Sequence, residues 1–235
     1  EGKGTFELPY NIRLIVGGSG LNVGYYVRKD SDVQTMTDVK TKRIGCTYSG
    51  APRIAIYSAG ELANAGLTWD DVVCVPRVSL YEGQKEDVTE KRLDVFYASV
   101  GSAVTQELDA TVGIRFLGLD PSPEAVARMR EVYPASIAKV MPGPPGIDKP
   151  MWLTFIGNCL VARADLGINT EYEITKAMWQ NYGELAPKSP KLKGWTPEAF
   201  CSTTALIPYA EGAIKWYKEI GAWTEEMEAL QRSLL

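Results

Sequence analysis

Small polar residues between an apolar run and a proline make one stretch of this sequence suited to binding a ligand. Residues 44–60 read IGCTYSGAPRIAIYSAG. The apolar start predicts a short strand, and Pro52 with the apolar residues that follow at helical spacing predicts a helix. The first N–H groups of a helix lack internal partners, and with the helix dipole they favour an anion such as a carboxylate or a phosphate. Residues 47–51 are therefore a candidate anion-binding loop.

The candidate loop offers hydroxyl side chains, backbone N–H groups and a glycine that lets a ligand approach the backbone. Tyr48 offers an apolar wall with a polar tip, and Arg53, one turn into the helix, offers a positive charge for a second carboxylate. Two plainer interpretations stay open: an ordinary strand-to-helix connection with a polar cap, and an arginine on the surface. The candidate ligand-binding residues of this stretch are Thr47, Tyr48, Ser49, Gly50, Ala51 and Arg53.

Two further segments of small polar residues follow predicted strands. Residues 93–100, LDVFYASV, predict a strand that ends at a Gly-Ser pair, and residues 12–16 predict a strand that ends in the Gly-Gly-Ser-Gly loop 17–20. Strands alternating with helices predict βαβ units and a mainly parallel sheet. Ligands of such sheets bind beyond the carboxyl ends of the strands, so we expect the three loops to line one site. The candidates that these segments add are Ser19, Tyr97, Ser99, Val100 and Gly101.

Composition excludes several classes of function. The chain of 235 residues is long enough for two modest domains or one large one, and its net charge of −4 argues against a nucleic-acid binder. No apolar run approaches the ~20 residues of a membrane helix, so we expect a protein that is not embedded in a membrane. Histidine is absent from the sequence, which excludes Ser-His-Asp and Cys-His mechanisms within this chain.

The four cysteines, Cys46, Cys74, Cys159 and Cys201, stand far apart and form no Cys-x-x-Cys pair. A zinc site is therefore not expected, and we expect no metal and no other cofactor. Cys46 and Cys74 each precede a loop in consecutive βαβ units, which predicts that they lie on neighbouring strands. Two interpretations of this pair stay open: buried free thiols, or a disulfide formed in an oxidising compartment.

Five segments of the chain, taken in order, are YYVRKDSDVQTMTDVKTKRIG, TYSGAP, LDVFYASVGSAVTQEL, FIGNCLVARADLGINTEYEITKAMWQN and IPYAEGAIKWYKEIGAW. Together they resemble the TAXI family of TRAP-transporter solute receptors. The resemblance extends from about residue 14 to residue 223. The segment at the C-terminal end is the most specific, although Tyr209-Ala210 replaces the usual His-Pro of the family.

The resemblance implies an α/β fold of the type II periplasmic-binding-protein kind, with two lobes joined by crossing strands and mainly parallel sheets. Residues 29–119 would form the inner lobe. Residues 1–28 and 151–235 would form the outer lobe and the crossings, and residues 120–150 a helix and a Pro/Gly-rich connection. Asn158 would face the cleft from the second crossing, or alternatively be a core amide satisfied by the backbone. A further N-terminal segment of the family has no counterpart here, and we expect one wall of the cleft to be missing with it.

The function that the resemblance implies is a periplasmic receptor. It would capture a small organic acid, such as a glutamate-like, 2-oxo or dicarboxylic acid, and deliver it to the membrane permease subunits of a TRAP transporter. No nucleic-acid partner and no catalysis are expected. Two alternatives remain: an enzyme on the same fold, for which Asp94 and Glu107 lie near candidate loops, and a cytosolic ligand-sensing domain.

Overall fold

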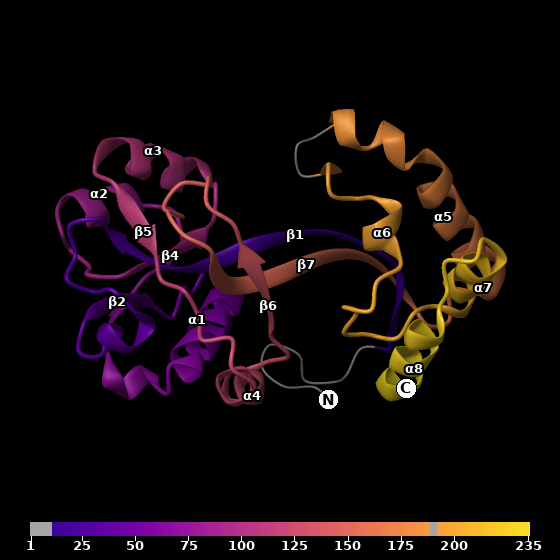
Figure 1. Cartoon of the computed structure of the whole chain (residues 1–235), viewed down its shortest axis with the longest axis horizontal. Coiled ribbons are helices and arrows are strands. Elements are labelled where there is room, and N and C mark those ends of the chain that lie inside the picture. The colour runs from indigo at the N-terminus through magenta and orange to yellow at the C-terminus, as the bar shows by residue number, and fades with distance from the viewer. Residues whose placement is uncertain (1–10, 189–191) are drawn as a thin grey trace. The chain divides into compact units, whose positions relative to one another are not determined.

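Two long strands, β1 (Ile12–Arg28) and β7 (Met151–Arg163), each contribute residues to two compact units of the chain. The computed structural model describes residues 11–188 and 192–235. Unit 1 takes the chain up to Gly20 and from Gly157 onward, whereas unit 2 takes Leu21–Ile156. Figure 1 shows β1 and β7 as the two longest strands, neighbours in one sheet. The boundaries proposed for an inner and an outer lobe stay a prediction.

Unit 2 contains strands and helices in alternation. In one sheet, β1 lies next to β7 and pairs with β4 and β5 in antiparallel fashion, while β6 pairs with β7, also antiparallel. A second sheet consists of β2 and β3, which run parallel. The elements are η1 (Met36–Val39), β2 (Arg43–Cys46), α1 (Pro52–Asn64), η2 (Trp69–Asp71), β3 (Val73–Pro76), α2 (Gln84–Thr89), β4 (Phe96–Ser99), α3 (Ala103–Thr111), β5 (Ile114–Phe116), α4 (Pro123–Val132) and β6 (Ser136–Val140).

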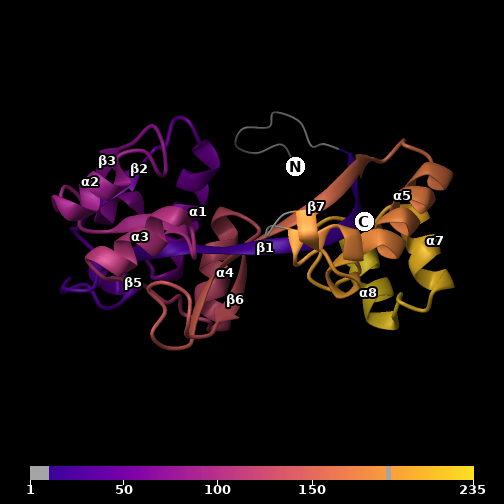
Figure 2. The same cartoon turned by 90° about the horizontal axis from the view of Figure 1, so that it is seen from above.

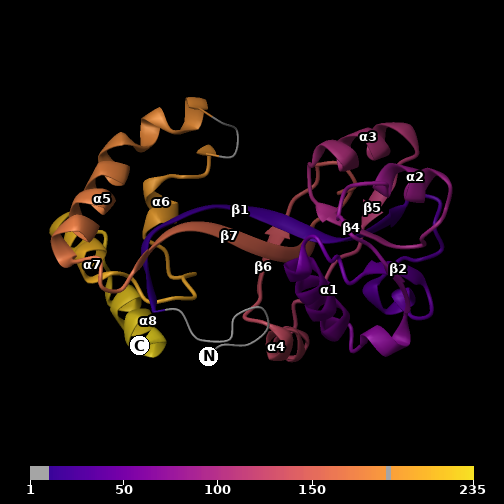
Figure 3. The ribbon, with the colours of Figure 1, turned by 180° about the vertical axis from the view of Figure 1, so that it is seen from behind.

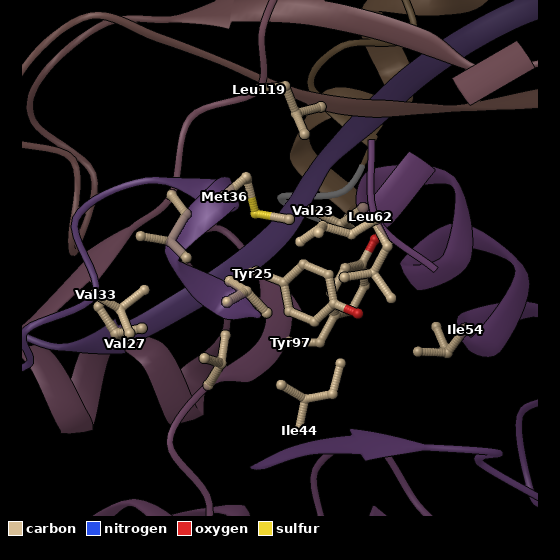
Figure 4. Close-up of a cluster of buried hydrophobic side chains, with 14 of the residues drawn as sticks. Val23, Tyr25, Val27, Val33, Met36, Ile44, Ile54, Leu62, Tyr97 and Leu119 are labelled. Carbon is tan, nitrogen blue, oxygen red and sulfur yellow. The ribbon is translucent and has the colours of Figure 1, made fainter. Parts of the chain in front are cut away.

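Adjacent side chains of β1 enter opposite cores of unit 2, because successive residues of a strand point to opposite faces. Tyr25 packs edge-on against Tyr97 with ring centroids 5.1 Å apart, in a cluster that also contains Leu62 of α1 (Figure 4). Tyr26 packs on the other face with Phe96 and Phe116. Residues of α1 and α4 contribute to the first cluster and residues of α2 and α3 to the second, so both faces of β1 are covered here.

Helices α1 and α4 lie side by side, as Figure 3 shows. Arg128 of α4 donates from Nε to the Ala63 carbonyl at 3.1 Å and from a terminal nitrogen to the Asn64 carbonyl at 2.6 Å. These carbonyls belong to the last turn of α1, where the usual donors four residues on are missing from the helix, and the Ala63 carbonyl also accepts Gly66 N–H at 3.0 Å. The arginine therefore completes the hydrogen bonding of that helix end.

Unit 1 packs the first half of β1 against helices from the C-terminal part of the chain. Leu14, Ile15 and Val16 share a core with the buried Tyr209 and Tyr217. Helices α5 and α7 lie next to each other (Figure 2), and the buried Glu171 carboxylate accepts the Gly212 N–H at 3.0 Å. The helices are α5 (Ile168–Asn181), η3 (Tyr182–Glu184), η4 (Ala186–Lys188), α6 (Pro197–Phe200), α7 (Glu211–Glu219) and α8 (Glu225–Leu234).

The fold is α/β, as the sequence predicts, but its sheets are mixed rather than mainly parallel. The predicted loop at residues 17–20 is wrong, because these residues continue β1 without interruption. β7 likewise runs through Gly157 and Asn158 without interruption.

Candidate functional site

The carboxyl ends of three parallel segments meet in unit 2. β2 and β3 pair in parallel, and Ile44 of β2 forms a parallel bridge with Val95, next to β4. The segment after β3 forms hydrogen bonds with the loops after both β2 and β4. Ser49 N–H donates to the Arg77 carbonyl at 3.1 Å, and the Tyr81 hydroxyl shares a 3.1 Å hydrogen bond with the Ser99 hydroxyl. We name residues 47–53, 77–81 and 99–102 together the strand-end cluster.

The backbone donors predicted for anion binding are engaged by the protein itself. Ser49 N–H and Gly50 N–H donate to the Arg77 and Val78 carbonyls, at 3.1 and 2.8 Å, and Ala51 N–H donates to the Tyr48 carbonyl at 2.7 Å. Val100 N–H donates to the Asn22 carbonyl at 2.8 Å. These N–H groups therefore do not form the open anion site that the sequence predicted.

Backbone conformation explains why the loop after β2 turns toward the next strand. Thr47 and Tyr48 both have positive φ, 61° and 45°, a conformation that costs free energy for residues other than glycine. This turn places Ser49 and Gly50 against the segment that follows β3. A Cβ added to Gly50 would lie 3.0 Å from the Val78 carbonyl oxygen, so this glycine is needed for the packing of the loop.

Side chains are the groups that the strand-end cluster presents to solvent. Thr47, Ser49 and Arg53 are exposed. The Thr47 hydroxyl donates to the Cys46 carbonyl at 2.8 Å, whereas no hydrogen bond of the Ser49 hydroxyl or the Arg53 guanidinium is found among the described residues. Two donors suited to a carboxylate, one of them charged, thus lie at the start of α1.

The two tyrosines predicted to line the site are core residues instead. Tyr48 is buried beneath its loop, close to Arg77, and burial raises the pKa of its hydroxyl. Tyr97 is buried in the first core of unit 2 and donates its hydroxyl to Glu61 at 2.9 Å. Neither tyrosine presents an accessible wall, because the aromatic rings that look suitable for a ligand also fill a core well.

Ser19 and Asn158 belong to unit 1, apart in sequence and unit from the strand-end cluster. Ser19 lies within β1 beside Gly194, and a Cβ added to Gly18 would contact the Trp195 ring. The glycines of residues 17–20 therefore admit the segment around Trp195 rather than form a loop. Asn158 is exposed within β7, so the alternative of a buried core amide is wrong.

A disulfide links the two strands that lead into the strand-end cluster, and one residue of the cluster forms an ion pair. Cys46 and Cys74, on the neighbouring strands β2 and β3 as predicted, form a disulfide with Cα atoms 5.5 Å apart. Arg77 pairs with the buried Asp87 of α2. The sequence did not single out Arg77 or Tyr81, because their roles depend on contacts with residues distant in the chain.

The described parts of the chain contain no group of three or more Cys, Asp or Glu side chains that could hold a metal ion. Within the same residues, no helix combines the length and the apolar character needed to span a membrane.

Comparison with known families matches residues 1–221 to the model of the NMT1-like family. The chain belongs to the NMT1-like family. Among solved structures it is similar to the periplasmic aliphatic sulphonate binding protein SsuA from Escherichia coli, at 10% identity and a TM-score of 0.38. That match covers 96% of this chain and 55% of the other.

Two further solved structures match this member of the NMT1-like family. The probable amino-acid ABC transporter extracellular-binding protein ytmK from Bacillus subtilis matches at 12% identity and a TM-score of 0.39, over 79% of this chain and 63% of that one. The L-cystine solute receptor of Neisseria gonorrhoeae matches at 13% identity and a TM-score of 0.34, over 93% of this chain and 59% of that one. The chain thus spans less than two thirds of each of the three structures.

Proposed function

We propose that this chain is the ligand-capturing part of an extracytoplasmic solute receptor that serves a membrane transporter, and that it is not an enzyme. The observation that carries the proposal is the strand-end cluster, where loops after three strands meet and present hydroxyl groups and Arg53 to solvent. Membership of the NMT1-like family and the Cys46–Cys74 disulfide support it. Disulfides persist mainly in oxidising compartments such as the periplasm.

The finer proposal is a receptor of the TAXI type for a TRAP transporter, with a small organic acid as its ligand. Its support is the sequence resemblance given above and the chemistry of the exposed groups. A guanidinium binds a carboxylate through two parallel hydrogen bonds, and the Ser49 hydroxyl adds a neutral donor. A glutamate-like or dicarboxylic acid offers a carboxylate to each of these groups, and a 2-oxo acid offers a carboxylate and a ketone oxygen.

The proposal is tested by calorimetric titration of the chain with glutamate, a 2-oxo acid and a dicarboxylic acid, and with arginine, cystine and an alkyl sulfonate for comparison. We expect binding of an acid of the first group. Arg53→Ala should weaken it at least about tenfold, because a charge-assisted hydrogen bond is lost, and Ser49→Ala by about threefold to tenfold.

The matched control is Lys40→Ala. Lys40 is exposed and cationic like Arg53 but precedes β2, at the opposite end of the strand, and pairs with Asp71 at 3.3 Å. It should leave affinity unchanged. Equal loss of affinity in both variants would show a nonspecific effect of charge and contradict the site, whereas binding of only the comparison ligands would contradict the proposed ligand class.

A further inference from the structure

Glu61, in the last turn of α1, is fully buried in unit 2 and joins four elements. Its carboxyl oxygen Oε1 accepts hydrogen bonds from the hydroxyls of Tyr97 on β4, at 2.9 Å, and Thr154 on β7, at 2.6 Å. Its Oε2 accepts the Tyr25 N–H of β1 at 3.2 Å. One side chain thus connects α1 to β4 and to both long strands.

The groups around this carboxyl are neutral hydroxyls. Tyr25 and Tyr97 face it from β1 and β4, and Tyr133 lies close to it from the segment between α4 and β6. The facing residue of β7, Thr154, does not titrate. No lysine or arginine of the described residues pairs with Glu61, and burial without a cation disfavours the ionised form of a carboxyl.

Acceptors for a proton on this carboxyl are also present. The Ser58 hydroxyl, one turn earlier on α1, is buried near Tyr25, and the Tyr133 hydroxyl is buried near Thr154. Each hydroxyl oxygen can accept a hydrogen bond. A protonated Glu61 also keeps oxygen lone pairs for the bonds from Tyr25, Tyr97 and Thr154.

We propose that Glu61 is a buried proton-binding site that makes the stability of the junction between α1, β4, β1 and β7 depend on pH. The junction is most stable when the carboxyl carries its proton. Burial raises the pKa of Glu61 to about 7, opposed in part by the hydrogen bonds from Thr154, Tyr97 and Tyr25. This property concerns the framework of unit 2 and is independent of the proposed function.

The direction of the pH dependence follows from linkage. A carboxyl whose pKa is higher in the folded state binds its proton more tightly there than in the unfolded chain. The stabilisation is therefore fully present below the unfolded pKa, which is about 4.3 for glutamate. It is lost as pH rises from there to about 7, and no further loss is expected at higher pH.

The first test reads the titration of the unmodified chain. The side-chain carboxyl carbon of Glu61 is assigned by through-bond NMR and followed from pH 4 to 9. We expect a midpoint close to neutrality. A midpoint of Glu61 below about 5, the range of unperturbed glutamates, would overturn the proposal.

The second test compares unfolding by urea at pH 5 and pH 8. The isosteric Glu61→Gln removes the titration, so the ratio of its unfolding equilibrium constant to that of the wild type should change at least about tenfold between the two pH values. Glu131→Gln, on the exposed side of α4, is the matched control and should keep a constant ratio. A constant ratio for Glu61→Gln would refute the proton site even if that variant is less stable overall.

Discussion

Two carboxyl groups are buried in unit 2, and the protein surrounds them differently. Asp87 of α2 forms an ion pair with Arg77, whose side chain remains 27% exposed. Glu61 of α1 receives hydrogen bonds only from an amide and two hydroxyls. One carboxyl is compensated by a charge at the edge of the unit, and the other by neutral donors within its core.

The position of each carboxyl decides how the fold offsets the cost of burying it. Arg77 comes from the segment after β3, where its guanidinium can reach both Asp87 and solvent, so only one of the two charges is fully dehydrated. Glu61 lies between α1 and the sheet, where a cation would need a second expensive desolvation. Burying neutral hydroxyl donors costs less free energy than burying a cation. Neutral donors also allow the carboxyl to keep its proton.

We expect the largest effect on stability from Arg77→Ala. Removal of the cation leaves Asp87 buried with its charge uncompensated, which should lower the free energy of unfolding by about 3 kcal/mol. Urea unfolding at pH 7 measures it. Arg92→Ala, which removes an exposed ion pair with Glu90, is the matched control and should change little. Similar small losses in both variants would mean that Asp87 does not depend on Arg77.

Tyr97→Phe should have a smaller effect, because it removes one of three donors and no charge. The expected loss is about 1 to 2 kcal/mol. It should be larger at pH 8 than at pH 5, since the hydroxyl stabilises the ionised form of Glu61 and loss of that bond raises its pKa further. Unfolding curves at the two pH values measure this difference. An equal loss of stability at both pH values would show that the Tyr97 hydroxyl does not affect the titration of Glu61.

Local signals in the sequence predicted much of the secondary structure. Ser122 and Thr224 are helix-cap residue types, and their hydroxyls accept from Ala125 N–H and Met227 N–H, at 3.3 and 3.2 Å. Pro52 begins α1 as expected. Such signals act within one turn of a helix, so the residues that cause the structure stand next to it in the sequence.

Long-range contacts explain what the sequence did not predict. Residues 17–20 have the composition of a loop, yet the segment around Trp195 packs on them and they remain in β1. Tyr97 has the chemistry of a binding residue, yet its hydroxyl is used by Glu61, thirty-six positions away. The loops after β2 and β4 were located correctly, but the segment that joins them was missed because its hydrogen bonds cross the fold.

Asp87→Asn should give the smallest effect and sharpens the comparison most. It keeps the shape of the side chain and leaves the guanidinium of Arg77 unpaired, but that guanidinium is partly exposed and can be hydrated. We therefore expect a loss of only about 1 kcal/mol, that of one hydrogen bond, by urea unfolding at pH 7. The pair would then be asymmetric, since removal of the cation costs more than removal of the anion. If Asp87→Asn were as costly as Arg77→Ala, the guanidinium would need its partner as much as Asp87 does, and the pair would behave as a fully buried one rather than as one with access to water.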